Sequence, residues 1–295
     1  GLIEIKTIET LSEEWEIYEN FKPFDTVQSN RRDKQKAFVN YEVFANNKWN
    51  PIKKVIRHKT NKKIYRINTH YGVVDVTEDH SLLSSKRGKI KPGECVVGET
   101  KLFHCFPNEL VEELDMYENS VKTREEKEAF IYGVFFCSGN CDYNCKSENK
   151  YKIVPNKILN GNYGVRKNFF LGYCTAYGYK SINTDIKSIC FSNKGKIGSS
   201  QLYYLCKTLG YNVSINTIKD KLDIYEITCI LTDLSKSENI LNKMIYLRDS
   251  EDEYVYDLET EHGTYCAGVG ELEIFNTDSV FLKFKSYKEQ YIKNM

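Results

Sequence analysis

Alternating apolar and polar residues dominate the first 115 positions of the chain. Residues 2–6, 37–43, 63–68 and 73–76 each place every second side chain on one face. A period of two is typical of antiparallel strands that have one face in water. Helical signals are weak here, apart from residues 12–15, which have the composition of a helix start. The pattern therefore predicts a β-rich segment.

The pattern changes near residue 116, where two apolar runs at 129–136 and 169–176 precede a mixture of strand and helix signals. Strand-like alternation returns at 255–259 and 270–275. An α/β domain inserted into a β-domain explains this order best. For the inserted part we predict a strand at 188–191, a helix at 197–209, a hairpin from 211–215 and 223–227, and a further helix at 235–244.

Composition narrows the classes of function. Of the 295 residues, 41% are hydrophobic and 28% are charged, which suffices for a packed core and an ordinary surface. A formal net charge of +1 gives no chain-wide attraction to nucleic acid or to a membrane. No apolar run approaches the ~20 residues of a membrane span, and the N-terminus lacks the features of a signal peptide. We expect a cytoplasmic protein without membrane association.

Ten cysteines without a secretory signal predict reduced thiols in an intracellular compartment, not a disulfide framework. Cys137, Cys141 and Cys145 recur every fourth residue, so a metal cluster is the alternative. No histidine lies nearby and no CxxC pair occurs, which favours buried or half-buried thiols. We expect neither a bound metal nor another cofactor.

Three separated features share one further pattern. Thr77 and His80 form a T-x-x-H motif after a strand, Asp257 lies in a later strand, and Asn276 is followed by Thr277. Each is weak alone, because an Asn–Thr pair is usually a turn, a single histidine is more often structural, and the aspartate could be a surface carboxylate. Their order together resembles the inteins, which are protein-splicing elements with the Hint β-fold.

The resemblance covers roughly residues 1–115 and 250–276. It implies a mainly β Hint splicing domain, formed by residues 1–115 and 249–276 and interrupted at 116–248. The sequence that starts at Thr277 resembles the T-D-S strand of family B DNA polymerases, and inteins recur immediately before that strand. Residues 277–295 are therefore expected to be a C-extein from a DNA polymerase. That the chain is simply a polymerase fragment is disfavoured, because only these last residues resemble one.

An asparagine can cleave the peptide bond that follows it. Its side-chain amide attacks its own backbone carbonyl and forms a succinimide, which requires a polarised carbonyl and a protonated leaving amine. Asn276 supplies this nucleophile, and the hydroxyl of Thr277 can accept an acyl group as a branched ester. The freed Thr277 amine then attacks the ester and restores a peptide bond. The expected activity is single-turnover, autocatalytic cleavage and ligation.

The resemblance also implies roles at the upstream junction. His80 would protonate the departing amide nitrogen during the first acyl shift, Thr77 would orient the scissile peptide, and Asp257 would hold the upstream nucleophile. Two positions depart from the usual pattern. Phe275 stands where inteins often have histidine, and His262 is not followed by the usual aromatic residue. Activation of the terminal asparagine is therefore expected to depend on His262 or on other groups.

Inteins begin with Cys or Ser, whereas residues 1–6 resemble the second half of their first motif. We expect either a truncated chain or, as the favoured alternative, the large C-terminal fragment of a split intein. Such a fragment would splice in trans with a short N-terminal intein fragment that carries the Cys or Ser nucleophile. The flanking DNA polymerase exteins are the other expected partners.

The two apolar runs resemble the paired helices of LAGLIDADG homing endonucleases. Gly133 and Gly172 occupy positions that permit close contact between these helices. An active enzyme has an aspartate as the penultimate residue of each motif, where the two carboxylates bind divalent metal. Ser138 and Tyr177 stand there and supply no anionic oxygen. We expect an α/β LAGLIDADG-type domain without nuclease activity; the alternatives are an active homing endonuclease, a DNA-binding remnant that recognises the intein-free polymerase gene, and a generic helical insertion.

Overall fold

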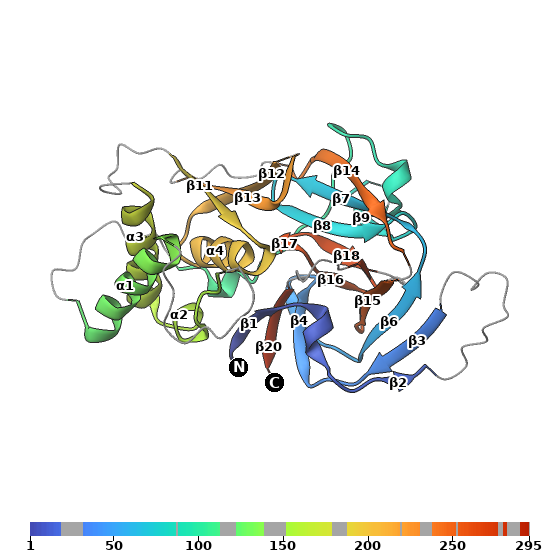
Figure 1. Ribbon diagram of the computed structural model, residues 1–295, viewed down its shortest axis with the longest axis horizontal. Coiled ribbons are helices and arrows are strands. Elements are labelled where there is room, and N and C mark those ends of the chain that lie inside the picture. Colours follow the sequence, from blue (N-terminus) through green and yellow to red (C-terminus); the bar gives the residue numbers. More distant parts are fainter. Residues whose placement is uncertain are drawn as a thin grey trace. The chain divides into compact units, whose positions relative to one another are not determined.

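The computed structural model describes the chain except for residues 19–31, 87, 113–121, 139–151, 179–187, 219, 231–237, 252, 277–279, 282–289 and 295. The chain forms two compact units (Figure 1). Unit 1 comprises residues 1–107 and 238–295, and unit 2 comprises residues 108–237. Unit 2 is thus inserted into unit 1 in the sequence, at somewhat earlier positions than the 116–248 expected above.

Unit 1 is built from antiparallel strands, so the prediction of a mainly β segment is confirmed. The largest sheet has the order β14 (Leu241–Asp249), β7 (Lys63–Thr69), β8 (Gly72–Thr77), β19 (Val280–Phe281), β15 (Glu253–Glu259), β6 (Lys54–Thr60), β3 (Arg32–Ala37), β2 (Glu16–Ile17), with β17 (Val269–Gly270) against β8. A second sheet has the order β10 (Gly88–Ile90), β9 (Leu82–Ser84), β18 (Glu273–Phe275), β16 (Thr264–Cys266). A third has the order β1 (Ile3–Lys6), β20 (Gln290–Asn294), β4 (Tyr41–Ala45), β5 (Lys48–Pro51).

One hydrophobic core joins these sheets. Every residue of β8 is buried, and Val43 of β4 and Ile274 of β18 belong to the same cluster. A buried ion pair crosses from β7 to β8, where the Arg66 guanidinium contacts both carboxylate oxygens of Asp75 at 2.7 and 2.8 Å. Bidentate geometry satisfies both charges, which is the condition for burying such a pair. The core therefore holds β8 rigidly up to its end at Thr77, where the candidate site begins.

Three local predictions for unit 1 were wrong. The helix expected at 235–244 is not formed in its described part: strand β14 begins at Leu241, because this segment pairs with β7. Its apolar spacing fits both periods, and the free edge of a sheet decides between them. The helix start at residues 12–15 is a turn after the 3₁₀ helix Ile8–Leu11, closed by hydrogen bonds between the Ser12 hydroxyl and Glu14. The strand expected at 37–43 is split between β3 and β4.

Unit 2 packs helices with a three-stranded antiparallel sheet. The predicted strand at 188–191, the helix at 197–209 and the hairpin that follows are all confirmed. The 3₁₀ helix Asn108–Leu110 starts this unit, and the 3₁₀ helix Pro92–Glu94 belongs to unit 1. The elements of unit 2 are α1 (Arg124–Ser138), α2 (Asn156–Leu159), α3 (Tyr163–Tyr177), β11 (Ser188–Lys194), α4 (Lys196–Thr208), β12 (Asn212–Ile218) and β13 (Lys221–Ile230), with sheet order β11-β13-β12.

Helices α1 and α3 approach each other closely at two glycines. A Cβ atom at Gly133 would lie 2.0 Å from the carbonyl oxygen of Phe169, and one at Gly172 would lie 2.0 Å from that of Phe130. Backbone atoms cannot move aside as a flexible side chain can. The expectation that these glycines permit close helix contact is therefore confirmed.

Replacing Gly133 by alanine is expected to destabilise unit 2 by about 2–3 kcal/mol, because the added methyl group forces the two helices apart. Urea unfolding followed by circular dichroism measures this loss. Gly93→Ala is the control, since a Cβ atom there meets no other atom within 4 Å. Equal unfolding midpoints for Gly133→Ala and the unaltered protein would contradict the packing described here.

Candidate functional site

The candidate site lies at the ends of β9 and β18, which pair antiparallel through Leu82 and Ile274. Residues 78–81 link β8 to β9, and Asn276 directly follows β18. His80 lies two residues before Leu82, and Asn276 lies two residues after Ile274. Next to both, the backbone N–H of Phe275 donates to the Ser81 carbonyl at 3.3 Å.

Asn276 is held on its other side by the turn before β16. Its backbone N–H donates to the carbonyl of Gly263 at 2.7 Å. Gly263 has a φ of 73°, in the left-handed region, and a Cβ atom there would lie 3.2 Å from Oδ1 of Asn276. Glycine therefore serves two purposes, since it adopts this turn without strain and leaves room for the asparagine carboxamide. Asn276 directly follows β18, Gly263 directly precedes β16, and His80 lies two residues before β9; β9 and β16 are the neighbours of β18 in this sheet.

Thr77 and His80 are both buried at the end of β8. The backbone N–H of His80 donates to the Thr77 carbonyl at 3.0 Å, which closes the turn. The Thr77 hydroxyl donates to Oδ1 of Asp79 at 2.9 Å, and the Lys62 ammonium contacts Oδ2 at 2.5 Å. Burial disfavours the Asp79 carboxylate, but Lys62 and the Thr77 hydroxyl together hold its pKa below the ordinary value. Asp79 thereby fixes the orientation of the Thr77 side chain.

Asp79→Asn is expected to lower the stability of the protein near neutral pH and to have less effect in acid. The folded-state pKa of Asp79 lies below its ordinary value of 3.8. The ionised group therefore stabilises the fold above that value, and this contribution is lost as the pH falls through the folded-state pKa. Urea midpoints of both proteins at about pH 7 and about pH 3 measure the difference. A difference that stays the same at both values would contradict the ion pair with Lys62.

Asp257 is buried in β15, where its carboxylate accepts two hydrogen bonds. Oδ1 accepts from the hydroxyl of Tyr265 at 2.8 Å and from the backbone N–H of Leu258 at 2.8 Å. Burial and the nearby carboxylate raise the pKa of Tyr265 well above its ordinary value, so this phenol stays a donor. Tyr265 pairs in turn with Ile274, two residues before Asn276. Asp257 is thus connected to the strand that carries Asn276 through Tyr265.

The remaining predicted site residues have fewer described contacts with the candidate site. His262 is exposed and directly precedes Gly263 in the turn. Phe275 is half-buried, and the Lys89 ammonium lies 4.7 Å from the centroid of its ring. Thr277 lies outside the described residues, so its expected role stays a prediction.

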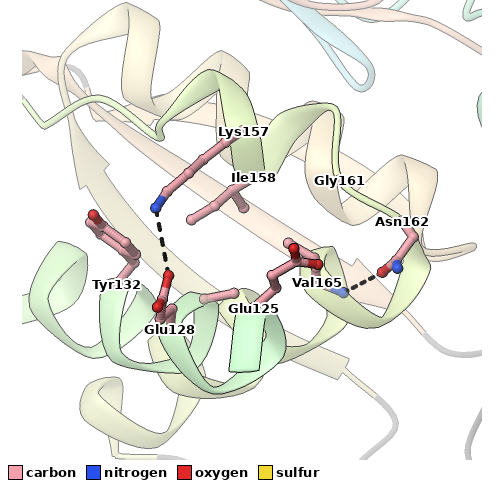
Figure 2. Close-up of a pocket in the computed structure, with 9 residues that line it drawn as sticks. Glu125, Glu128, Tyr132, Lys157, Ile158, Gly161, Asn162 and Val165 are labelled. Carbon is pink, nitrogen blue, oxygen red and sulfur yellow. Dashed lines mark hydrogen bonds and ion pairs between the residues drawn. The ribbon is translucent and has the colours of Figure 1, made fainter. Parts of the chain in front are cut away.

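In unit 2, Ser138 and Tyr177 are the last residues of α1 and α3. The Ser138 hydroxyl donates to the Phe135 carbonyl, and the Tyr177 hydroxyl accepts from the backbone N–H of Ser192. A cavity of about 240 Å³ lies beside the N-terminal half of α1 (Figure 2). Neither Ser138 nor Tyr177 lines it; Lys157 crosses it towards Glu128 at 3.9 Å. The cavity therefore does not coincide with the predicted endonuclease positions.

The described residues contain neither a cluster of metal ligands nor a membrane-spanning helix. Within the described part of the chain, no three His, Cys, Asp or Glu side chains gather as a metal site would require. Cys141 and Cys145, considered above as ligands, lie outside the described residues. Among the described helices, none combines the length and apolarity needed to cross a membrane.

Sequence reasoning missed several residues that shape this site, namely Lys62, Asp79, Gly263 and Tyr265. Asp79 had a local signal, because a carboxylate two residues after a threonine commonly closes a turn by hydrogen bonding. Lys62 and Tyr265 had none, since Lys62 and Asp79 are 17 residues apart and Tyr265 and Asp257 are 8 apart, and each pair meets only when the strands fold against one another. Such contacts depend on register, which a single sequence does not reveal.

The sequence matches no known family profile, but it is similar to parts of DNA polymerases. It is 36% identical over 355 residues to a DNA polymerase of Acanthamoeba polyphaga mimivirus, covering 96% of this chain and 20% of that protein. It is 42% identical over 66 residues to a DNA polymerase of Thermococcus hydrothermalis, covering 22% of this chain and 4% of that protein. The chain therefore spans at most about a fifth of these curated relatives.

Among solved structures, a transcription factor IIB Mvu mini-intein aligns with 14% identity and a TM-score of 0.31, covering 93% of this chain and 96% of that one. A score this low does not establish a common fold. The polymerase similarity is more informative, because it extends over nearly the whole chain and not only over residues 277–295. This chain is similar, almost from end to end, to one segment of a much longer viral DNA polymerase.

Proposed function

We propose that this chain is a protein-splicing element carried within a DNA polymerase, and that it cleaves the bond between Asn276 and Thr277. The observation that carries the proposal is the backbone hydrogen bond from Phe275 to Ser81, the residues directly beside Asn276 and His80, while Gly263 holds the Asn276 backbone. An asparagine in an ordinary turn would not require these backbone contacts. The similarity of nearly the whole chain to one segment of a polymerase supports an element inserted into that protein.

The cleavage step needs only atoms of this chain. The Asn276 side-chain nitrogen Nδ2 attacks the Asn276 backbone carbonyl carbon and a succinimide forms. The bond from that carbon to the Thr277 nitrogen breaks. Nδ2 gives up one proton as the ring closes and the leaving nitrogen takes one up, so no net proton is consumed. The hydrogen bond to Gly263 fixes the backbone nitrogen of Asn276, which reduces the conformations that must be searched before attack. We assign the supply of this proton to His80, which precedes Ser81, the residue whose carbonyl accepts from the Phe275 N–H beside Asn276.

Full splicing would add two steps upstream of this cleavage. A Cys or Ser nucleophile takes the upstream peptide as an ester or thioester, and the Thr277 hydroxyl then receives it. We propose that a short N-terminal intein fragment supplies this nucleophile in trans and that the exteins are polymerase segments. Thr77, fixed by Asp79, would orient the upstream scissile peptide, and Asp257 would hold the nucleophile.

Incubation of the purified chain tests the cleavage step directly. We expect slow release of a peptide that begins at Thr277, and a larger fragment that is lighter by one water than the free acid because it ends in a succinimide. Adding a peptide with an N-terminal extein followed by Cys or Ser and the missing motif residues tests the complete reaction, which should yield ligated exteins. An intact Asn276–Thr277 bond and no ligated product, with both pieces folded, would rule out the proposed function.

Unit 2 supports a second proposal, that it descends from a LAGLIDADG homing endonuclease and has lost the nuclease activity. Helices α1 and α3 are both 15 residues long, and a shift of 39 positions maps Gly133 onto Gly172 and Phe130 onto Phe169. The close contacts are reciprocal, since each glycine meets the other helix at the equivalent phenylalanine. Such reciprocity is what two related repeats around a two-fold axis would produce.

The sheet of unit 2 presents a polar but weakly charged face. Cys190, Thr228 and Ser214 form one row across its exposed side, and Ser192, Glu226 and Asn216 form the next. Lys194 at the end of β11 is paired with Asp223 at 3.2 Å. Phosphate binding relies on unpaired cationic side chains, so any remaining DNA affinity would be low.

Retention on a duplex of the uninterrupted polymerase gene, measured at rising salt, tests the DNA-binding remnant. We expect weak binding that disappears at physiological salt, and no cleavage when Mg²⁺ is added, because Ser138 and Tyr177 offer no carboxylate. Metal-dependent cleavage products from that duplex would indicate an active nuclease and contradict the second proposal.

A further inference from the structure

Two buried cysteines of unit 1 lie unusually close together. The sulfur atoms of Cys105 and Cys266 are 2.7 Å apart, and both residues are free thiols. A disulfide bond is about 2.05 Å long, so a shift of well under 1 Å would bring these atoms to bonding distance. The two residues are 161 positions apart in the sequence. Only the folded unit brings them together.

The backbone around both residues is firmly held. Cys266 lies in β16 and pairs with Glu273 of β18, and the backbone N–H of Cys105 donates to the Glu271 carbonyl at 2.9 Å. Cys105 and Cys266 therefore both bond to the segment of residues 271–273. Cys266 is therefore positioned by strand pairing, and Cys105 by a backbone hydrogen bond next to the bridge between His104 and Leu272, which makes their approach a property of the fold.

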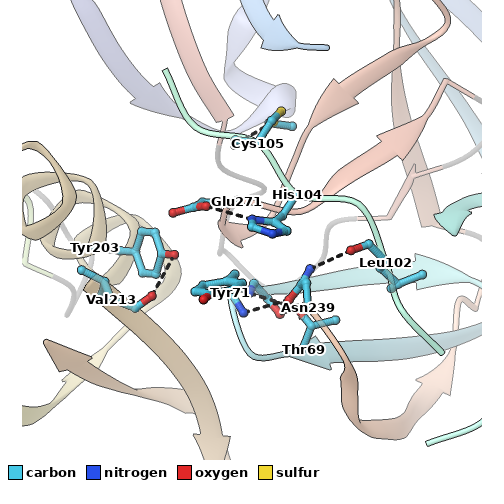
Figure 3. Close-up of polar contacts among 11 residues, drawn as sticks. Thr69, Tyr71, Leu102, His104, Cys105, Tyr203, Val213, Asn239 and Glu271 are labelled. Carbon is cyan, nitrogen blue, oxygen red and sulfur yellow. Dashed lines mark hydrogen bonds and ion pairs between the residues drawn. The ribbon is translucent and has the colours of Figure 1, made fainter. Parts of the chain in front are cut away.

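The polar surroundings of the pair come from the same segment (Figure 3). Nδ1 of His104 lies 3.2 Å from Oε2 of Glu271, and the His104 ring stacks on Tyr71. The carboxylate of Glu273 accepts from the Thr264 hydroxyl at 2.6 Å and from the Asn46 backbone N–H at 3.1 Å. Both carboxylates near the thiols are thus engaged by hydrogen bonds or by the histidine.

These surroundings make one of the two thiols more reactive than the other. The hydrogen bond from Cys266 favours the Cys105 thiolate, but burial and the Glu273 carboxylate outweigh it, so the pKa of Cys105 lies above the ordinary value. Complete burial and the bond to Cys105 raise the pKa of Cys266 further. Cys105 is also the more exposed, at 6% against 1%. Cys105 is therefore the thiol that reacts first.

We propose that Cys105 and Cys266 are a redox modification site, a dithiol that a small disulfide oxidant such as oxidised glutathione converts into an intramolecular disulfide. The Cys105 thiolate attacks one sulfur of the oxidant and releases one glutathione thiolate. Cys266 then loses its proton and displaces the second glutathione, which closes the Cys105–Cys266 bond. In sum, the two thiols lose two protons and two electrons, and one oxidised glutathione becomes two reduced ones.

The cross-link would have a specific structural effect. Cys105 lies near the end of the first part of unit 1, and Cys266 lies in the part that follows unit 2. The disulfide would therefore join the two separated halves of unit 1 covalently and close a loop that contains all of unit 2. Closing so long a loop restricts the unfolded chain and stabilises the folded one. This inference stands apart from the proposed splicing reaction, since it requires no cleavage at Asn276.

Peptide mapping of the oxidised full-length chain tests the site. The protein is incubated with oxidised glutathione, remaining thiols are alkylated, and the unreduced digest is analysed by mass spectrometry. We expect one linked peptide pair that contains Cys105 and Cys266, a loss of two of the ten free thiols, and a rise in the thermal midpoint that dithiothreitol reverses. The reaction should accelerate as the pH is raised from neutral, because both thiol pKa values lie above the ordinary value.

Cys266→Ala is expected to remove the linked peptide and the thermal shift. Cys95→Ala is the matched control, because Cys95 belongs to the same unit, is half-buried and donates to the Lys91 carbonyl at 3.4 Å. It should leave both readouts unchanged. Peptide mapping of the unaltered chain tests the site without depending on the folding of any variant. Alkylated Cys105 and Cys266 after full oxidation, or a linked pair between other cysteines, would overturn the proposal.

Discussion

Asn276→Ala is expected to abolish release of the peptide that begins at Thr277, by a factor of at least roughly a hundred. The substitution removes the only side-chain amide that can attack the Asn276 carbonyl, and an alanine methyl group offers no replacement nucleophile. In the reaction assembled with an N-terminal fragment, the branched ester on Thr277 should still form and then accumulate. Mass spectrometry of the reaction over time measures both species.

Asn61→Ala is a suitable control, because this asparagine is exposed in the turn between β6 and β7. It should leave the rate of release unchanged. Release at an undiminished rate from Asn276→Ala would mean that another group cleaves the bond, and the proposed function would then be wrong. Loss of release together with loss of folding would be recognised from circular dichroism and would require Asn276→Asp as a second variant.

His80→Ala is expected to block the first acyl shift in the assembled reaction, by roughly 10²–10⁴-fold. The imidazole is the proposed general acid for the leaving amide nitrogen, and His80 precedes Ser81, whose carbonyl accepts from the Phe275 N–H. Rapid-quench sampling for the thioester or ester intermediate, trapped with hydroxylamine, measures this step. Cleavage at Asn276 should also slow, because the proposal gives the same imidazole a role at both junctions.

A buried histidine also contributes to packing, so a matched control is needed. His58 in β6 is 1% exposed, as His80 is, and lies in the same unit. Both alanine variants should lose similar stability, and only His80→Ala should lose the acyl shift. If His58→Ala slowed the reaction equally, the effect would reflect destabilisation and the role given to His80 would fail.

Much of the architecture was predictable because it depends on local periodicity. The alternation in 63–68 and 73–76 became β7 and β8, and the helical spacing of 197–209 became α4. The helix predicted at 235–244 was wrong because local periodicity did not decide the structure of this segment. Its apolar residues fit a helix or a strand equally well, and pairing with β7 decided for β14. Where two periods fit one segment, a partner far away in the sequence makes the choice.

The sequence by itself determined which groups are available for chemistry: a terminal asparagine before a hydroxyl residue, a T-x-x-H motif, and two glycines spaced to bring helices together. Only the tertiary structure decided that Asn276 meets Gly263, that Asp79 fixes Thr77, and that Cys105 reaches Cys266. The physical reason is that side-chain identity is a local property, whereas register and the crossing of strands between sheets depend on pairing energies summed over distant segments.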